Sequence, residues 1–287
     1  MAFILGSANF LGKYGIEKVT KSVHDLEFFK ILNNAHNLCI SRIDSSESYP
    51  SIENFSNSDL QEIKKYKIDT KINLGMKFTE HEFMQHVYRS MMNLDVKNFE
   101  CLYLHNLNPL TEPNIEITKR CLKRILNDGL AIKIGVSVYS EDDIRFSLAM
   151  FPDFQSFQIL ENICDRRFYN SKYLSELHND GIELNIRSIF LQGLLLAEPS
   201  LIPPYLAGAK STITDFDNLV TKVNSSRLEY CVAYAKGISW ASNIVIGVGS
   251  LSELIAITNV QISLTRKQIE KIPELPSNLK DPRYWKK

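Results

Sequence analysis

Short apolar segments alternate with longer amphipathic segments along this chain, and that alternation limits the folds open to it. The apolar segments are rich in Ile, Val, Leu and Phe, often at consecutive positions, as in strands that are buried on both faces. Strands separated by helices indicate a parallel α/β architecture. We expect eight strands, at residues 2–7, 39–45, 68–74, 99–104, 131–138, 154–160, 182–189 and 243–248.

The amphipathic segments carry signals for helix starts and stops. Thr79 followed by Glu82 has the spacing of a capping box, and Asp128-Gly129 is typical of a helix end. We expect helices at residues 24–34, 79–92, 114–127, 140–150, 169–179 and 217–236, with a last one starting at 250.

Eight strands with intervening helices in 287 residues predict a single-domain (β/α)₈ TIM barrel. The alternative is a doubly wound sheet, but its usual GxGxxG fingerprint is absent, since the first loop reads GSANFLG at 6–12. No linker or low-complexity tract divides the chain. We therefore predict one barrel over residues 1–287, with 262–287 as a C-terminal tail.

The balance of charges excludes some partners. The 33 Lys plus Arg equal the 33 Asp plus Glu, whereas proteins that grip nucleic acid or anionic membranes usually carry a basic excess. We predict neither a nucleic-acid nor a membrane partner. A secretory signal is not expected, and five widely spaced cysteines without a CxxC pair are typical of reduced core residues. These features predict a cytoplasmic protein.

The histidines also bear on the kind of chemistry. The six histidines form no HxH or HExxH pair, so we predict no metal site. A metal-dependent barrel isomerase is the least favoured of the alternatives for the same reason.

Barrel enzymes carry their sites at the C-terminal ends of the strands, and four polar residues meet there. Asp44 ends the second strand, Tyr49 follows it, Lys71 lies in the third strand and His105 ends the fourth. Each has a structural explanation if taken alone. Lys71 is costly to bury without a partner, however, and Asp44 on the adjacent strand is the expected one. Together the four form a coherent catalytic set.

The segments around these residues resemble the aldo/keto reductase family. RIDSSESY at 42–49 is similar to the family segment IDTAxxYG, DTK at 69–71 to its TTK strand, and LYLH at 102–105 to its LxLH strand. The likeness continues through KIGVS at 133–137, Gln158 with Asn162, IRS at 186–188, QGLL at 192–195 and IGV at 246–248. It covers nearly the whole chain, in order.

The resemblance implies reduction of a small carbonyl compound to an alcohol, with NADP(H) or NAD(H) as the cofactor. The substrate would be an aldehyde, a ketone or a sugar derivative. Tyr49 would protonate the carbonyl oxygen, Lys71 held by Asp44 would favour the phenolate, and His105 would orient and polarise the carbonyl. The alternative is a cofactor-binding regulatory protein with little turnover. Both a monomer and a small homo-oligomer remain open.

The resemblance also implies a set of cofactor contacts. Ser137 and Gln158 match residues that hold the nicotinamide carboxamide, although Val138 stands where the family often has Asn. Arg187 replaces a tyrosine that stacks on the nicotinamide; its guanidinium would lie against that ring, or else face outward or pair with a carboxylate. The predicted cofactor-binding residues are Ser7, Ser137, Gln158, Arg187, Ser188, Gln192, Gly247, Gly249, Ser250 and Glu253.

The turn after the last strand carries the prediction about the cofactor's 2′-phosphate. Many NADPH-preferring members of the family have Lys or Arg there, whereas this chain has Val248, Gly249 and Ser250, followed by Glu253. A carboxylate repels a phosphate but accepts hydrogen bonds from a ribose hydroxyl. We predict weaker selectivity for the 2′-phosphate, in the direction of NAD(H). The plainer interpretation makes Glu253 an ordinary acidic residue of a first helical turn.

Substrate identity depends on the loops. The segment 197–215 is long enough to cover the mouth of the barrel, and 281–285 is expected to fold back over it. Candidates for an apolar or sugar-stacking wall are Phe10, Tyr14, Tyr139 and Phe190, although core packing is the favoured role of Phe190.

Overall fold

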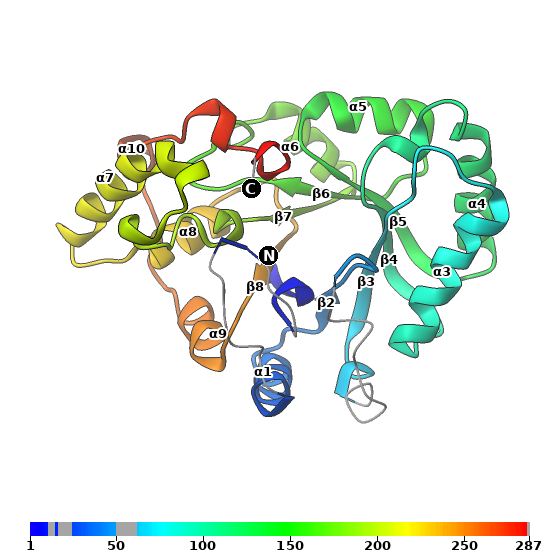
Figure 1. The fold of residues 1–287 in the computed structure, drawn as a ribbon, viewed down its shortest axis with the longest axis horizontal. Coiled ribbons are helices and arrows are strands. Elements are labelled where there is room, and N and C mark those ends of the chain that lie inside the picture. Colours follow the sequence, from blue (N-terminus) through cyan, green and yellow to red (C-terminus); the bar gives the residue numbers. More distant parts are fainter. Residues whose placement is uncertain (11–14, 17–24, 50–61, 286–287) are drawn as a thin grey trace.

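The apolar segments form eight parallel strands that close into a barrel with helices on its outside (Figure 1). The computed structural model describes residues 1–10, 15–16, 25–49 and 62–285. Each strand pairs with the next in sequence and β8 pairs with β1, so the predicted (β/α)₈ barrel is confirmed. The strands are β1 (Ala2–Gly6), β2 (Arg42–Asp44), β3 (Lys67–Ile72), β4 (Phe99–Leu104), β5 (Ala131–Val138), β6 (Ser156–Leu160), β7 (Glu183–Arg187) and β8 (Asn243–Gly247).

Helices on the outer face shield the strands from water, and the core lies between these two layers. Thr79 and Glu82 form the expected capping box at the start of the helix that follows β3. The α-helices are α1 (Asp25–Asn37), α3 (Glu80–Leu94), α4 (Ile115–Asn127), α5 (Glu141–Met150), α6 (Lys172–Asn179), α7 (Lys210–Thr221), α8 (Arg227–Lys236), α9 (Leu251–Thr258) and α10 (Arg266–Lys271). None of those in the described part of the chain is long and apolar enough to cross a membrane.

The single helix expected over 217–236 is wrong, since two helices occupy this region. Helix α7 ends at Thr221 and α8 begins at Arg227. Between them Asn224 has a left-handed backbone, with φ of 52°, and Ser226 opens a new capping box with Glu229. The amphipathic period continues across the break because both helices bury one face against the same core.

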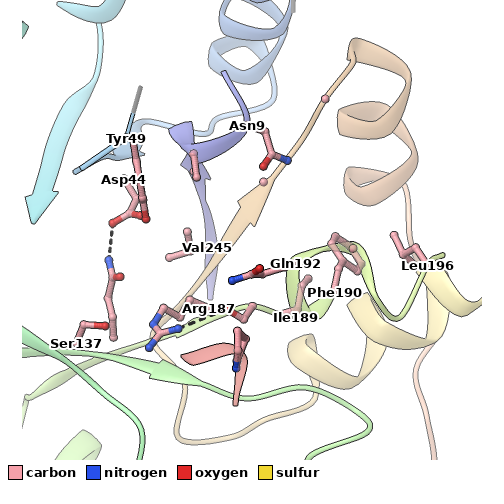
Figure 2. Close-up of a pocket in the computed structure, with 18 of the residues that line it drawn as sticks. Asn9, Asp44, Tyr49, Ser137, Arg187, Ile189, Phe190, Gln192, Leu196 and Val245 are labelled. Carbon is pink, nitrogen blue, oxygen red and sulfur yellow. Dashed lines mark hydrogen bonds between the residues drawn. The ribbon is translucent and has the colours of Figure 1, made fainter. Parts of the chain in front are cut away.

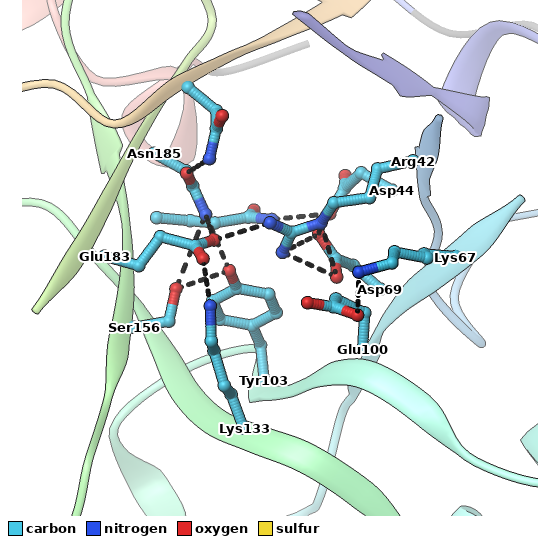
Figure 3. Close-up of polar contacts among 12 residues, drawn as sticks. Arg42, Asp44, Lys67, Asp69, Glu100, Tyr103, Lys133, Ser156, Glu183 and Asn185 are labelled. Carbon is cyan, nitrogen blue, oxygen red and sulfur yellow. Dashed lines mark hydrogen bonds and ion pairs between the residues drawn. The ribbon is translucent and has the colours of Figure 1, made fainter. Parts of the chain in front are cut away.

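The N-terminal half of the barrel interior is filled by paired polar side chains (Figure 3). Arg42 binds both carboxylate oxygens of Asp69 and donates to Glu183 Oε1 at 2.8 Å. Lys133 Nζ lies 2.5 Å from the other oxygen of Glu183, and the hydroxyl of Tyr103 accepts from Asn185 at 2.9 Å. Since each of these buried groups has a partner, this half of the barrel is a packed structural layer.

The C-terminal segment is tied to the loop after β6. The amide of Leu275 donates to the carbonyl of Cys164, and Arg166 donates to the carbonyl of Ile272 at 3.0 Å. Lys280 lies 3.6 Å from the buried carboxylate of Asp165. These contacts hold the last described residues against the C-terminal end of the barrel.

We predict that Gly135→Ala strongly destabilises the barrel. A Cβ at Gly135 would lie 2.4 Å from the carbonyl oxygen of Ser156 and 2.7 Å from the ring of Tyr103. The backbone of β6 is fixed by its ladder, so we expect a loss of about 1–3 kcal/mol or more in unfolding free energy, measured by urea denaturation. Gly75→Ala is the control, because the nearest atom to its Cβ is 4.0 Å away. Equal midpoints for the two variants would contradict the prediction.

Candidate active site

A cavity of about 560 Å³ opens at the C-terminal ends of the strands (Figure 2). Every strand, or the residue directly after it, contributes to its lining. In strand order these residues are Gly6, Asp44, Lys71, His105, Ser137, Gln158, Arg187 and Gly247. This is the end of a TIM barrel at which catalytic residues from several strands converge.

A buried ion pair forms one wall of the cavity. Lys71 Nζ lies 2.6 and 2.5 Å from the two carboxylate oxygens of Asp44, and it also donates to the carbonyl of Ser45 at 3.0 Å. The exposed fractions of Lys71 and Asp44 are 2% and 3%. Gln158 donates a further hydrogen bond to Asp44. The pair expected from the sequence is therefore present, and its geometry leaves little freedom to the ammonium group.

Tyr49 lies beside this pair. Its ring centroid is 5.3 Å from Lys71 Nζ and 6.4 Å from the centroid of the His105 ring, which it meets edge-on. Burial raises the pKa of Tyr49 above its ordinary value, the charge of Asp44 raises it further, and Arg187 lowers it. The role of Lys71 in favouring the phenolate remains a prediction. Tyr49 is a neutral phenol at neutral pH.

His105 is held neutral by its surroundings. Burial, together with the positive charges of Lys71 and Arg187, lowers the pKa of its imidazole to about 3. Its backbone amide donates to the carbonyl of Ile72, and its Nδ1 lies 3.5 Å from Ser46 Oγ. A neutral imidazole has one N–H donor and one acceptor. His105 is thus able to donate a hydrogen bond without introducing a charge.

Two amide side chains near the cavity have buried atoms without a partner among the described residues. Gln158 lines the cavity and its Oε1 accepts no hydrogen bond. Asn162 Nδ2 donates none. A buried polar group left unpaired costs about 1–3 kcal/mol. Ser137 lies opposite Gln158 in the β5–β6 register and also lines the cavity. The free Gln158 oxygen beside a hydroxyl fits the amide group of a carboxamide.

Arg187 ends β7 and lines the cavity. Its guanidinium carbon lies 4.5 Å from the centroid of Tyr139, while its N–H groups reach Ser188 Oγ at 3.4 Å and the carbonyl of Val138 at 3.5 Å. Among the described residues its buried Nε has no hydrogen-bond partner, and no carboxylate there forms an ion pair with it. Pairing with a carboxylate, one of the roles left open by the sequence, is therefore absent from this part of the structure.

A family model described as the aldo/keto reductase family matches residues 3–276 of the chain. The chain belongs to the aldo/keto reductase family. This membership supports an oxidoreductase that acts on carbonyl compounds.

Among solved structures, this aldo/keto reductase is similar to the glycerol dehydrogenase AKR11B4 from Gluconobacter oxydans. The TM-score is 0.67 at 15% sequence identity, over 94% of this chain and 89% of the other. At that identity the likeness concerns the fold. A comparison with curated proteins finds no match.

The β8 turn of this aldo/keto reductase is occupied by acidic side chains. Glu253 accepts from the amide of Gly249 at 2.7 Å, and Glu27 of α1 accepts from the amide of Leu251 at 2.8 Å. The hydroxyl of Ser250 caps α9 by accepting from the amide of Glu253. Two carboxylates therefore already bind N–H groups that a phosphate would otherwise use.

Most of the predicted cofactor residues line the cavity, and two do not. Among the described residues, Ser7 lies outside the lining, since it is buried and hydrogen-bonded to Ser45 at 2.8 Å. Ser250 is also absent, because it caps α9. The predicted residues that line the cavity are Ser137, Gln158, Arg187, Ser188, Gln192, Gly247, Gly249 and Glu253.

The remaining wall differs in part from the sequence expectation. Tyr139 and Phe190 both line the cavity, so core packing is not the whole role of Phe190. Phe10 is 1% exposed, packs against Phe28 and is absent from the lining. Tyr14 lies outside the described residues.

The segment 197–215 does not reach the described lining, which instead includes residues that the sequence did not indicate. Their signal is weak, because an apolar residue in a buried strand or helix does not show which side it faces. They are Asn9, Leu196, Leu228, Val245 and Ile257. Pro282 and Arg283 also line the cavity, in agreement with the expectation that 281–285 folds back over the mouth of the barrel. No group of three or more His, Cys, Asp or Glu among the described residues is arranged to hold a metal ion.

The low pKa of His105 predicts a pH-dependent contribution to stability. Between pH about 3 and 6.5 the imidazole of His105 is protonated in the unfolded chain but neutral in the folded protein. The free energy of unfolding of the wild type should therefore decrease as the pH is lowered through this window, by up to about 1.4 kcal/mol per pH unit from this group. His105→Asn removes this contribution. The free energy of unfolding of the wild type minus that of the variant should therefore be smaller at pH 5.0 than at pH 7.5.

Urea denaturation at pH 7.5 and 5.0 measures this difference. His81→Asn, at an exposed position of α3, is the matched control and should follow the wild type at both pH values. A wild-type minus His105→Asn difference that is the same at both pH values would show that His105 takes up its proton normally.

Proposed function

We propose that this protein reduces a small aldehyde, ketone or sugar derivative to an alcohol, using hydride from NADH or NADPH. The observation that carries the proposal is the arrangement of Asp44, Tyr49, Lys71 and His105 on one cavity, with Lys71 bound to both oxygens of Asp44. Family membership supports the class of reaction. A nicotinamide would supply the hydride when bound, and the unpaired oxygen of Gln158 fits its carboxamide.

Tyr49 is the proton donor in this proposal. Burial and Asp44 keep its hydroxyl protonated, so the proton is present when the carbonyl oxygen requires it. As the carbon accepts hydride, the C=O double bond becomes a C–O single bond and the oxygen takes the Tyr49 proton. The ammonium of Lys71, 5.3 Å from the ring centroid of Tyr49, stabilises the phenolate left behind until water returns the proton.

His105 orients the carbonyl. Because its imidazole is neutral, it donates a hydrogen bond to the carbonyl oxygen and does not compete with Tyr49 as a strong acid. Asp44 keeps Lys71 in place, and its charge is needed for this because a lone ammonium would be costly to bury.

The acidic β8 turn supports a preference for NADH over NADPH. Glu253 lies on the cavity lining and its carboxylate binds the amide of Gly249, and Glu27 binds the amide of Leu251. A 2′-phosphate at this turn would meet two negative charges, whereas a ribose hydroxyl would find acceptors.

We expect Tyr49→Phe to abolish carbonyl reduction while cofactor binding persists. The variant keeps the ring beside Lys71 but removes the proton, so the rate should fall by roughly 10²–10⁴. Steady-state rates with a panel of aldehydes, ketoses and nucleotide sugars measure the loss, and NADH fluorescence titration measures binding. Tyr205→Phe, outside the cavity lining, is the control. An unchanged rate in Tyr49→Phe would remove Tyr49 from the proton-donor role, and binding without turnover in the wild type would favour a regulatory protein.

The cofactor preference has a separate test. The wild type should bind NADH more tightly than NADPH, and Glu253→Gln should narrow the ratio of dissociation constants by about tenfold, which corresponds to about 1.4 kcal/mol. Fluorescence titration with both cofactors gives the ratio without any substrate. Glu270→Gln, on the exposed face of α10, serves as the control. Tighter binding of NADPH by the wild type would contradict the preference.

A further inference from the structure

We propose that the substrate carries an anionic group, a carboxylate or a phosphate, which Arg187 binds next to the reacting carbonyl. This inference rests on the proposed carbonyl reduction and names the class of its substrate. Its basis is the charge balance of the cavity lining, whose charged residues are Asp44, Lys71, Arg187, Glu253 and Arg283.

Arg187 is the cation of this set for which the described chain offers no opposite charge. Lys71 is bound to Asp44, and Arg283 is bound to both oxygens of Asp281. Glu253 uses its carboxylate on the amide of Gly249. A guanidinium without a counter-ion in a partly buried position is costly, so the cavity favours a ligand that brings a negative charge.

The hydrogen bonds of Arg187 point to the same conclusion. A guanidinium has five N–H donors, and in the described chain those of Arg187 find only two partners, at 3.4 and 3.5 Å. Its Nε is buried and donates to nothing there. These distances are at the long limit for hydrogen bonds. The guanidinium thus keeps donors available for the two-oxygen contact that carboxylates and phosphates make.

The position of Arg187 places this charge near the reacting groups. Its positive charge adds to burial in lowering the pKa of His105, and it partly opposes the rise that burial causes in the pKa of Tyr49. Arg187 and Tyr49 lie on the same cavity lining (Figure 2), and His105 also belongs to this lining. An anionic group held by Arg187 would therefore be part of the same small molecule as the carbonyl that these residues contact.

A second guanidinium lies close by. The guanidinium carbons of Arg187 and Arg283 lie 4.5 and 3.4 Å, respectively, from the ring centroid of Tyr139. Two cations that share one ring repel each other, and Asp281 compensates Arg283 alone. An anion at Arg187 would relieve the remaining repulsion. Arg283 is the secondary contact in this proposal, and Arg187 the primary one.

The anion at Arg187 has two possible sources, the substrate and the phosphates of the cofactor, and the experiment separates them. Matched carbonyl pairs test the substrate: succinic semialdehyde against butanal, and glyceraldehyde 3-phosphate against glyceraldehyde. Titration with NADH tests the cofactor. The variants are Arg187→Gln and Arg187→Lys, and Arg120→Gln on the exposed face of α4 is the control.

The wild type should prefer the charged member of at least one pair by about ten- to hundredfold in kcat/KM, mainly through KM. Arg187→Gln should bring this ratio close to one, and Arg187→Lys should recover part of it because the charge remains while the planar fork is lost. Arg120→Gln should keep the wild-type ratio. Calorimetry with malonate and with inorganic phosphate, in the presence of NADH, should show binding to the wild type and at least tenfold weaker binding to Arg187→Gln.

Three results would overturn the proposal. One is an equal rate with charged and neutral members in the wild type. Another is a preference for the charged member that survives in Arg187→Gln. The third is a loss of NADH binding in Arg187→Gln with the substrate ratio intact, which would assign the anion to the cofactor. If the wild type reduces no carbonyl, the proposed function fails, while the calorimetric comparison still decides whether Arg187 binds an anion.

Discussion

Two ion pairs inside the barrel, Arg42–Asp69 and Lys71–Asp44, determine how the site is built. In the β2–β3 register Asp44 lies opposite Asp69, so two buried carboxylates stand side by side. Neither would remain charged in an apolar interior without a cation. Each finds its cation on the neighbouring strand, two residues from its own register partner. The Arg42–Asp69 pair completes the packed layer, and the Lys71–Asp44 pair supplies the ammonium beside Tyr49. Removing one partner of such a pair typically costs about 3–5 kcal/mol.

Apart from the Lys71–Asp44 pair, cations and carboxylates lie on different elements around the cavity. Arg187 and Arg283 gather at Tyr139, whereas Glu253 and Glu27 occupy the turn after β8. A ligand that is anionic at one end and rich in hydroxyl groups at the other would be oriented by this distribution before it makes any close contact. Orientation of this kind depends on the distribution of charge within the cavity, which the zero net charge of the chain does not reveal.

The sequence predicted the barrel and the four residues around the ion pair because their signals are local. Apolar segments mark buried strands, and a lysine in such a segment calls for a carboxylate on the next strand. The break at Asn224 was missed because the apolar period runs through it. The raised pKa of Tyr49 was not predicted, because it depends on burial, which no spacing reveals. The contact of Arg283 with Tyr139 depends on a tail held to the loop after β6, more than one hundred residues earlier in the chain.

The lining of the cavity begins at Gly6 and ends at Arg283, and this has a consequence for the synthesis of the protein. Strand β1 leaves the ribosome long before its partner β8, so one of its edges stays open until residue 247 is available. An open edge of an apolar strand pairs readily with other chains. The edge of β1 is therefore open to such pairing until β8 is available, and the cavity gains its last described lining residues only when Pro282 and Arg283 dock. A chain cut after residue 247 would keep all eight strands, but its cavity would lack the wall made by Gly249, Glu253, Ile257, Pro282 and Arg283.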